Sequence, residues 1–387
     1  MKTSLVLSIF GATLVAATCV QAQITINPLS SFGGGDGWLA PGEDGYGYLT
    51  TGNTERGLAY NPVTGNLLLV SRANPTGTNA VNVRILDSLT GADLSPVGTG
   101  GLNLGSGVVS GGTFPINMVS VGSDGAIYVA NLTIQASTTP FKIYRWTDES
   151  ATPITAYNGT PIEGGRVGDT LDAIGGGAGT LLVAGFGNNP ATNGNNGYAI
   201  FDPTAGTHTQ VTFAGTPPNA GDFRLGITFT DAGHVIGSQG AGVDGFARYT
   251  SFSGTDGTLI GTAALTSGSQ RLFDYTVVGG VSLLAALDTV DSQIRLYDAS
   301  DPLNLAYLAT ATTLSEASVA NVNGTGAVAW GDAVYDSDSG QWLANLYALN
   351  SNNGIQAFLV TVPEPSTLGF LALGGLLLAA WRARGRR

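Results

Sequence analysis

The sequence predicts an all-β protein whose main body is a six-bladed β-propeller, with a seven-bladed propeller as the alternative. Short β-rich runs alternate with turn residues throughout residues 56–360, and no helical period of useful length interrupts them. Glycine supplies 58 of the 387 residues without a collagen-like period, which is typical of a fold with many turns. A hydrophobic fraction of 43% against 11% charged residues allows a sizeable buried core. We also expect an N-terminal signal helix and a C-terminal transmembrane helix.

The predicted propeller is a repeat of four apolar runs. In each copy the first two runs flank a turn rich in Gly, Asn or Asp, which is a hairpin signal. These pairs of runs are 57–60 with 67–70, 117–121 with 126–130, 171–174 with 181–184, 225–229 with 234–236, 272–278 with 281–285, and 318–322 with 327–330.

The third run is the most regular part of the repeat. It places one large side chain per copy at the same strand position, as stacked sheets require to fill the gap between neighbours. These side chains are Leu86, Trp146, Phe201, Tyr249, Tyr297 and Tyr347, separated by 60, 55, 48, 48 and 50 residues. The fourth runs are 95–97, 154–157, 209–213, 259–264, 305–309 and 355–360. Residues 23–55 form an N-terminal segment in which residues 24–26 could close the last blade or belong to another blade.

The N-terminus has the features of a Sec-type signal peptide over residues 1–22. Lys2 precedes an apolar run over residues 5–17, and small residues lead to a cleavage site after Ala22. The alternative is a lipidated Cys19, although the residues before it lack the usual pattern. Cleavage after Ala22 would remove the single cysteine, so the mature chain would be stabilised by burial without disulfides.

The C-terminus, residues 361–387, has three parts in a fixed order. A Pro-Glu-Pro motif is followed by an apolar stretch over residues 368–381, which is short for a membrane span, and then by a basic tail that would stay in the cytoplasm. The residues concerned are Pro363, Glu364, Pro365, Arg382, Arg384, Arg386 and Arg387.

This arrangement resembles the PEP-CTERM sorting signal of Gram-negative, exopolysaccharide-producing bacteria. The N-terminal signal peptide predicts export through the Sec translocon and cleavage by signal peptidase. The C-terminal resemblance implies an inner-membrane intermediate and processing by an exosortase near residues 363–365. It also implies delivery to the cell surface or to a biofilm matrix. The rhythm of the repeats, as in residues 57–62 and 124–130, is similar to that of bacterial surface propellers of the YVTN or NHL type.

The charge of the chain argues against nucleic acid as a partner. The net charge is −12 and the isoelectric point about 4.4, whereas phosphate binding needs a basic surface. Five of the 15 basic residues lie in the two predicted sorting segments, so the region between them is more acidic still. An exopolysaccharide or a surface protein remains as the expected partner.

Few residues suit catalysis or metal binding. His208 and His234 fall on different blades, and no zinc-ligand spacing or Gly-x-Ser-x-Gly motif occurs. The sequence from Asp336 to Asp338 is similar to the start of a Ca²⁺-binding loop. The residues that follow do not supply the remaining ligands of such a loop, so we favour a plain turn. We therefore predict no catalytic residue and no cofactor, with Ca²⁺ at this turn as the alternative.

Three further groups of residues that are close in sequence are candidate sites. Paired carboxylates could hydrolyse glycosides if they converge, and the candidates close in sequence are Asp169 with Asp172 and Asp288 with Asp291. Asp36 and Trp38, in a glycine-rich loop, could contact a glycan, although a tryptophan that plugs one end of the propeller is the simpler interpretation.

The sequence thus predicts an exported, non-catalytic binding or structural propeller linked to exopolysaccharide. The alternative is a secreted hydrolase of the six-bladed lactonase-like type, which would need a central metal held by Glu, Asn and Asp side chains from several blades.

Overall fold

A computed structural model describes residues 23–43, 46–73, 82–96, 99–187, 197–213, 223–238, 245–267, 269–311 and 319–364. These residues form β-strands and two short 3-10 helices, η1 (Gly33–Gly35) and η3 (Gly177–Gly179). Among them, no helix has the length and apolarity that a membrane span requires. The predicted signal helix over residues 1–22 and transmembrane helix over residues 368–381 lie outside the described residues.

The strands follow one another as antiparallel meanders. The first is β3 (Glu55–Tyr60), β4 (Asn66–Ser71) and β5 (Asn82–Asp87), and the second is β6 (Phe114–Val121), β7 (Ile127–Leu132), β8 (Phe141–Trp146) and β9 (Ile154–Gly159). The third comprises β10 (Arg166–Val167), β11 (Asp172–Ile174), β12 (Leu181–Gly187), β13 (Tyr198–Asp202) and β14 (Thr207–Phe213). The fourth is β15 (Gly226–Asp231), β16 (His234–Ser238), β17 (Phe246–Ser253) and β18 (Asp256–Ala264), and the fifth is β19 (Gln270–Val278), β20 (Val281–Asp288), β21 (Ile294–Asp298) and β22 (Ala306–Ala311). The last contains β23 (Gly326–Asp336), β24 (Gln341–Asn350) and β25 (Ile355–Pro363), with β1 (Thr25–Pro28) and β2 (Trp38–Leu39) both on β25.

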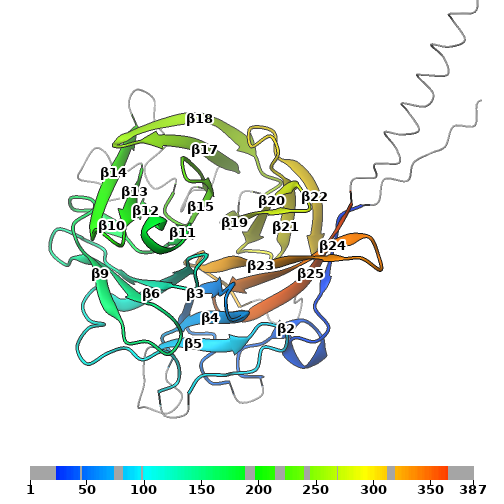
Figure 1. The fold of residues 1–387 in the computed structure, drawn as a ribbon, viewed down its shortest axis with the longest axis horizontal. Coiled ribbons are helices and arrows are strands. Elements are labelled where there is room, and N and C mark those ends of the chain that lie inside the picture. The colour runs from blue at the N-terminus through cyan, green and yellow to red at the C-terminus, as the bar shows by residue number, and fades with distance from the viewer. Residues whose placement is uncertain are drawn as a thin grey trace, which may run out of the picture.

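The meanders surround a central axis in a propeller-like ring (Figure 1). The innermost strands are β3, β6, β11, β15, β19 and β23. They contact one another in this order, and β23 contacts β3 in turn. The third and fourth meanders are joined into one nine-stranded sheet, because β14 and β18 pair in parallel at Thr212 with Asp256 and at Phe213 with Gly257. The predicted all-β, propeller-like architecture is confirmed.

Glycine allows the inner strands to approach one another closely. A Cβ atom on Gly226 would lie 1.6 Å from the carbonyl oxygen of Arg271 in the next meander, and one on Gly57 would lie 2.6 Å from the backbone nitrogen of Val119. No side chain fits at either distance, so the glycine excess serves strand contacts as well as turns.

The large side chains of the third runs fill the sheet interfaces as predicted. Trp146, Phe201, Tyr297 and Tyr347 are buried, and so is Leu86, whereas the exposure of Tyr249 is intermediate. Their rings contact neighbours from other strands; Tyr347, for example, stacks on Tyr60 with ring centroids 6.2 Å apart. Such contacts add to the stabilisation that burial alone provides.

The last meander differs from the predicted strand order by one strand. Residues 319–325 form a loop rather than the first strand, so the inner strand β23 contains residues 327–330, which were predicted as the second run. The predicted third run, residues 345–348, is in the second strand, β24. The outermost strand comes from the N-terminus instead, because β1 pairs with β25 from Thr25 opposite Thr361 to Pro28 opposite Phe358.

The first meander lacks the fourth strand predicted at residues 95–97. Only an isolated bridge between Leu86 and Asp93 occupies its place, and Val97 lies outside the described residues. Pro96 has no backbone N–H to donate to a strand ladder, which explains why no regular pairing forms here.

Replacing Ile26 with aspartate should destabilise the protein by about 2 kcal/mol, because Ile26 in β1 packs on the core beside β25 and the change would bury a charge there. Urea unfolding measures the effect. The matched control is Asn27→Asp, next to it on the exposed side of the strand. Equal losses for the two variants would contradict a closing role for β1.

Candidate functional site

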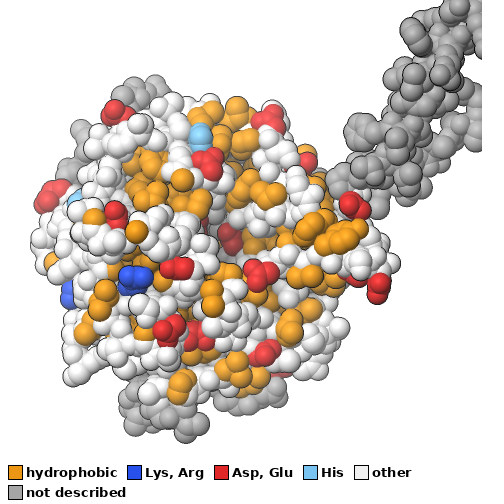
Figure 2. All heavy atoms as spheres, viewed as in Figure 1, with side chains coloured by type: hydrophobic (Ala, Val, Ile, Leu, Met, Phe, Trp, Pro, Cys, Tyr) orange, Lys and Arg blue, Asp and Glu red, His pale blue; other side chains and the backbone are white. Residues whose placement is uncertain are grey.

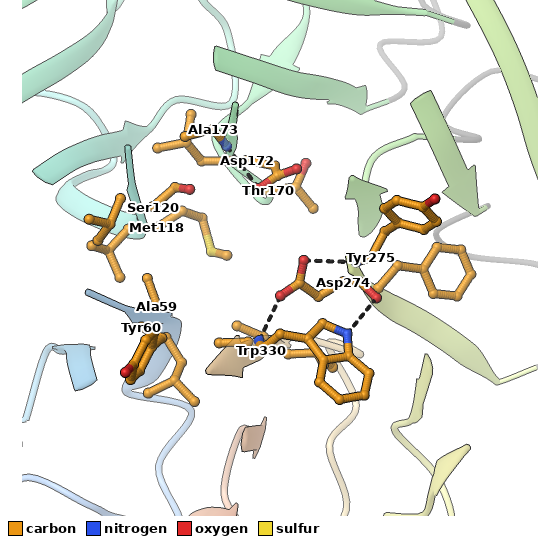
Figure 3. A pocket seen from close by; sticks show the side chains of 18 of the residues that line it. Ala59, Tyr60, Met118, Ser120, Thr170, Asp172, Ala173, Asp274, Tyr275 and Trp330 are labelled. Atoms are coloured by element: carbon orange, nitrogen blue, oxygen red, sulfur yellow. Dashed lines mark hydrogen bonds between the residues drawn. The ribbon is translucent and has the colours of Figure 1, made fainter. Parts of the chain in front are cut away.

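A cavity of about 350 Å³ lies on the axis of the ring and is lined by residues from all six inner strands (Figure 3). The face shown in Figure 2 is hollowed at its centre, and acidic side chains are spread over this face while basic ones are scarce. The lining combines aliphatic residues with the aromatic rings of Tyr60, Tyr275 and Trp330, and with three aspartates, Asp172, Asp274 and Asp332. The central cavity therefore combines aromatic and acidic side chains in one concave site, and we take it as the candidate functional site.

Two aspartates on inner strands link each strand to the next meander. Asp172 in β11 accepts hydrogen bonds from the backbone N–H of Phe229 (2.8 Å) and the hydroxyl of Thr228 (3.1 Å), both in β15. Asp274 in β19 accepts one from the backbone N–H of Trp330 in β23, at 2.8 Å. The second oxygen of each carboxylate is bonded by the N–H of the residue that follows it. Each aspartate thus accepts a hydrogen bond from a backbone N–H group that would otherwise be unpaired at the edge of the next inner strand. The hydrogen bonds also fix the orientation of the carboxyl group.

The two carboxyl groups hold their protons unusually tightly. Burial raises the pKa of Asp172 to about 6, although the hydrogen bonds from Phe229, Ala173 and Thr228 oppose the increase. Burial and then the negative charge of Asp172 raise the pKa of Asp274 well above its usual range. Because each group disfavours ionisation of the other, the pair retains a proton at a pH where ordinary aspartates have lost theirs. Such a pair can both donate and accept hydrogen bonds.

Aromatic rings border the same cavity. Tyr60 stacks on Tyr347 and donates its hydroxyl hydrogen to Asp332 at 3.1 Å. Trp330 donates its indole N–H to the backbone oxygen of Asp274 at 3.2 Å, so its ring is fixed beside Asp274. Tyr275 is bonded to Ser282 through its hydroxyl. The rings and carboxyl groups together form a wall that is part apolar and part hydrogen-bonding.

The structure separates Asp169 from Asp172 and holds Asp288 and Asp291 together on one arginine. Asp169 is buried at the N-terminal ends of the inner strands and binds Arg166 at 2.5 Å and Arg224 at 2.8 Å, whereas Asp172 lines the cavity. Asp288 and Asp291 share the guanidinium of Arg295, at 3.2 and 2.6 Å, and do not line the cavity.

The other candidates lie outside the cavity. Asp336 accepts bonds from the backbone of Asp338 and the hydroxyl of Ser339 in the exposed β23–β24 turn, and no group of three or more metal-ligating side chains occurs among the described residues. Asp36 accepts the backbone N–H of Trp38 at 2.8 Å, and the indole of Trp38 donates to the backbone oxygen of Asn353. Trp38 is half-buried against the β24–β25 turn.

The histidines are also distant from the cavity lining. His208 lies 3.0 Å from the hydroxyl of Tyr157, and burial lowers its pKa. His234 is 2.9 Å from Asp231 at a turn. Sequence reasoning missed Asp274, whose only signal is a carboxylate within the otherwise apolar run 272–278.

Comparisons with known proteins match two parts of the chain. Residues 46–233 match a family described as a domain of unknown function, DUF4623, and residues 361–387 match the PEP-CTERM protein-sorting motif. No curated protein matches the chain. Among solved structures, the chain is similar to a periplasmic gluconolactonase of Pseudomonas aeruginosa, with 15% identity and a TM-score of 0.41 over 80% of this chain and 88% of that one. The predicted sorting motif is confirmed, and it implies an exported protein that an exosortase processes.

Proposed function

We propose that the protein is an exported, non-catalytic surface propeller that binds uncharged sugar units of an exopolysaccharide in its central cavity. The observation that carries the proposal is that Asp172 and Asp274 both line the cavity, with the ring of Trp330 beside Asp274. A carboxyl pair that keeps one proton offers both a donor and acceptors to sugar hydroxyl groups, and aromatic faces pack on the apolar faces of sugar rings.

The finer points of export belong to the same proposal. Cleavage after Ala22, a transient membrane span over residues 368–381 and a place in a biofilm matrix would bring the cavity into contact with exopolysaccharide. The ring of six inner strands, closed from β23 to β3, supports a six-bladed propeller over the seven-bladed alternative. The N-terminal segment fits this count, because β1 completes the last blade instead of starting another.

The alternative, a lactonase-like hydrolase with a central metal, would use Glu, Asn and Asp side chains from several blades. The acidic residues that line the cavity are Asp172, Asp274 and Asp332, and Asp332 is already bonded to Tyr60. Within the described part of the chain these residues do not form a group that could share one ion. They do not fit the expected metal set, so we derive no catalytic step through a metal.

A glycan array probed with the full-length chain, followed by calorimetry on the glycans that bind, tests the proposal. We expect Asp274→Asn to weaken binding about tenfold, because an amide has one acceptor oxygen where the carboxyl group has two and cannot carry the retained proton. The control is Asp336→Asn in the exposed turn, which should bind normally. Unchanged affinity in both Asp172→Asn and Asp274→Asn, or hydrolysis of the bound glycan, would contradict a non-catalytic site at the pair.

A further inference from the structure

Five arginines gather where the inner strands begin, away from the central cavity. We call Arg56, Arg72, Arg166, Arg224 and Arg271 the arginine cluster. Arg56 lies in β3 and Arg271 in β19, Arg166 is in β10, Arg72 follows β4, and Arg224 lies two residues before β15. The cavity is lined by residues that come later in the inner strands β3, β15 and β19. The cluster and the cavity therefore lie one after the other along the axis of the ring.

The negative charge near the cluster does not balance it. The carboxylate of Asp169 is occupied by Arg166, through two hydrogen bonds of 2.5 and 2.6 Å, and by Arg224 at 2.8 Å. Glu55 is buried beside Arg56, and burial raises the pKa of its carboxyl. One of its oxygens accepts the backbone N–H of Thr50 instead of binding an arginine. Asp288 also acts on Arg271, but its carboxylate binds Arg295. Among the described residues, five arginines thus face three carboxyl groups at this level, a local positive excess in a chain of net charge −12.

Several guanidinium N–H groups in the cluster have no acceptor among the described residues. Arg56 is only 9% exposed, and while one of its terminal nitrogens donates to Thr325, its Nε has no partner. The Nε of Arg271 and one terminal nitrogen of Arg72 are buried in the same way. The Arg271 guanidinium lies directly over Gly324, where a Cβ would come within 1.9 Å of it. Buried charged donors without acceptors are costly, and an anion would remove that cost.

The electrostatics of the cluster agree with this geometry. Burial lowers the pKa of Arg56, and the nearby charge of Arg166 lowers it further while Asp169 opposes the change. Burial also lowers the pKa of Arg271; the charge of Asp288 opposes this change and the charge of Arg224 adds to it. An added negative charge would stabilise the protonated form of each arginine.

We propose that the arginine cluster is a binding site for an oxyanion, either a carboxylate or a phosphate group, held by Arg56 and Arg271. The planar guanidinium fork matches both groups and binds them through paired hydrogen bonds. Arg166 and Arg224 are held by Asp169 and provide positive potential around the site. This site does not depend on sugar binding in the central cavity.

Calorimetry and thermal unfolding of the full-length chain test the site, with inorganic phosphate and with sodium glucuronate as probes. Sodium chloride keeps the ionic strength constant, so a general salt effect is excluded. We expect saturable binding and a rise in melting temperature with at least one probe. Arg271→Gln should weaken this binding at least tenfold, and the control Arg145→Gln, on the third strand of the second meander, should not.

The outcomes separate the two anion sources and can overturn the proposal. Binding of phosphate alone assigns a tetrahedral anion, and binding of glucuronate alone assigns a carboxylate; either supports the site. No saturable effect of either probe, or equal binding by Arg271→Gln, overturns it. If Arg271→Gln does not fold, Arg271→Lys replaces it in the test. This variant keeps the positive charge but cannot form the paired hydrogen bonds of a guanidinium, so it should bind the probes more weakly than the wild type. Asp274→Asn should bind both probes normally, which distinguishes this site from the cavity.

Discussion

Replacing Asp169 with asparagine is expected to destabilise the protein by about 3–5 kcal/mol, the largest effect we foresee for a single substitution. The Asp169 side chain is only 2% exposed and binds both Arg166 and Arg224. Hydrogen bonds and charge from these arginines outweigh burial and hold the pKa of its carboxyl below the usual range. An amide of the same size leaves two cations without their counter-charge. Denaturant unfolding at pH 7 measures the loss.

A surface ion pair provides the control for this change. Asp231 binds His234 at 2.9 Å, but its side chain is 56% exposed, so Asp231→Asn should cost less than about 1 kcal/mol. The cost of Asp169→Asn should also shrink in acid, because a carboxyl with a lowered pKa stabilises the fold above its unfolded pKa and loses this contribution as the pH falls through its folded pKa. A loss as small as that of the control would show that Asp169 is not essential to the packing of β10 and β15.

The second large effect is a decrease in stability as the pH rises from about 4 to about 6. The pKa of Asp172 is about 6 in the folded protein against 3.8 for an ordinary aspartate. The folded state therefore binds more protons in this window, so this contribution is complete below the unfolded pKa and is lost as the pH rises through the folded one. A difference of about two pKa units corresponds to about 3 kcal/mol. Unfolding curves across this range measure it.

The Asp172→Asn variant isolates this contribution. Its side chain does not titrate, and removal of the neighbouring charge should also bring the pKa of Asp274 closer to its usual range. We expect the variant to lose less stability than the wild type between pH 4 and pH 7, even if its stability at pH 4 is lower. Asp336→Asn, in an exposed turn, should follow the wild-type curve. Parallel curves for Asp172→Asn and the wild type would rule out an unusual carboxyl at this position.

Most of the fold was predictable because its signals are local. The hairpins at residues 61–65 and 123–125, for example, combine turn residues with β-rich flanks, and both occur in the structure. The last meander was misassigned because Asn323 and Gly324 do form a turn, in which Gly324 N–H bonds Asn321, but this turn lies in a loop before β23. The pairing of β1 with β25 joins residues more than 300 positions apart, which local patterns do not specify.

The candidate site was less predictable than the fold. Asp172 and Asp274 are 102 residues apart, and neither has a neighbour in sequence that marks it as functional. They line the same cavity only because two inner strands of a closed ring place equivalent positions around one axis. The arginine cluster has the same origin, since Arg56 and Arg271 occupy corresponding places near the start of their strands. The net charge of the sequence shows that the chain is acidic overall, but it does not reveal that these arginines come together in the fold.

The pairing of β1 with β25 also determines when the protein can finish folding. Synthesis and export proceed from the N-terminus, so β1 emerges first and its partner, residues 355–363, emerges last. The final sheet of the ring has no outer strand until both β1 and β25 have crossed the membrane. The Pro-Glu-Pro part of the sorting motif begins at the last residue of β25, Pro363, and the carboxylate of Glu364 accepts a hydrogen bond from Tyr335 of β23. Closure of the ring and exposure of the sorting motif therefore occur at the same stage of export. A chain whose export stops before β25 can neither close the ring nor expose the motif.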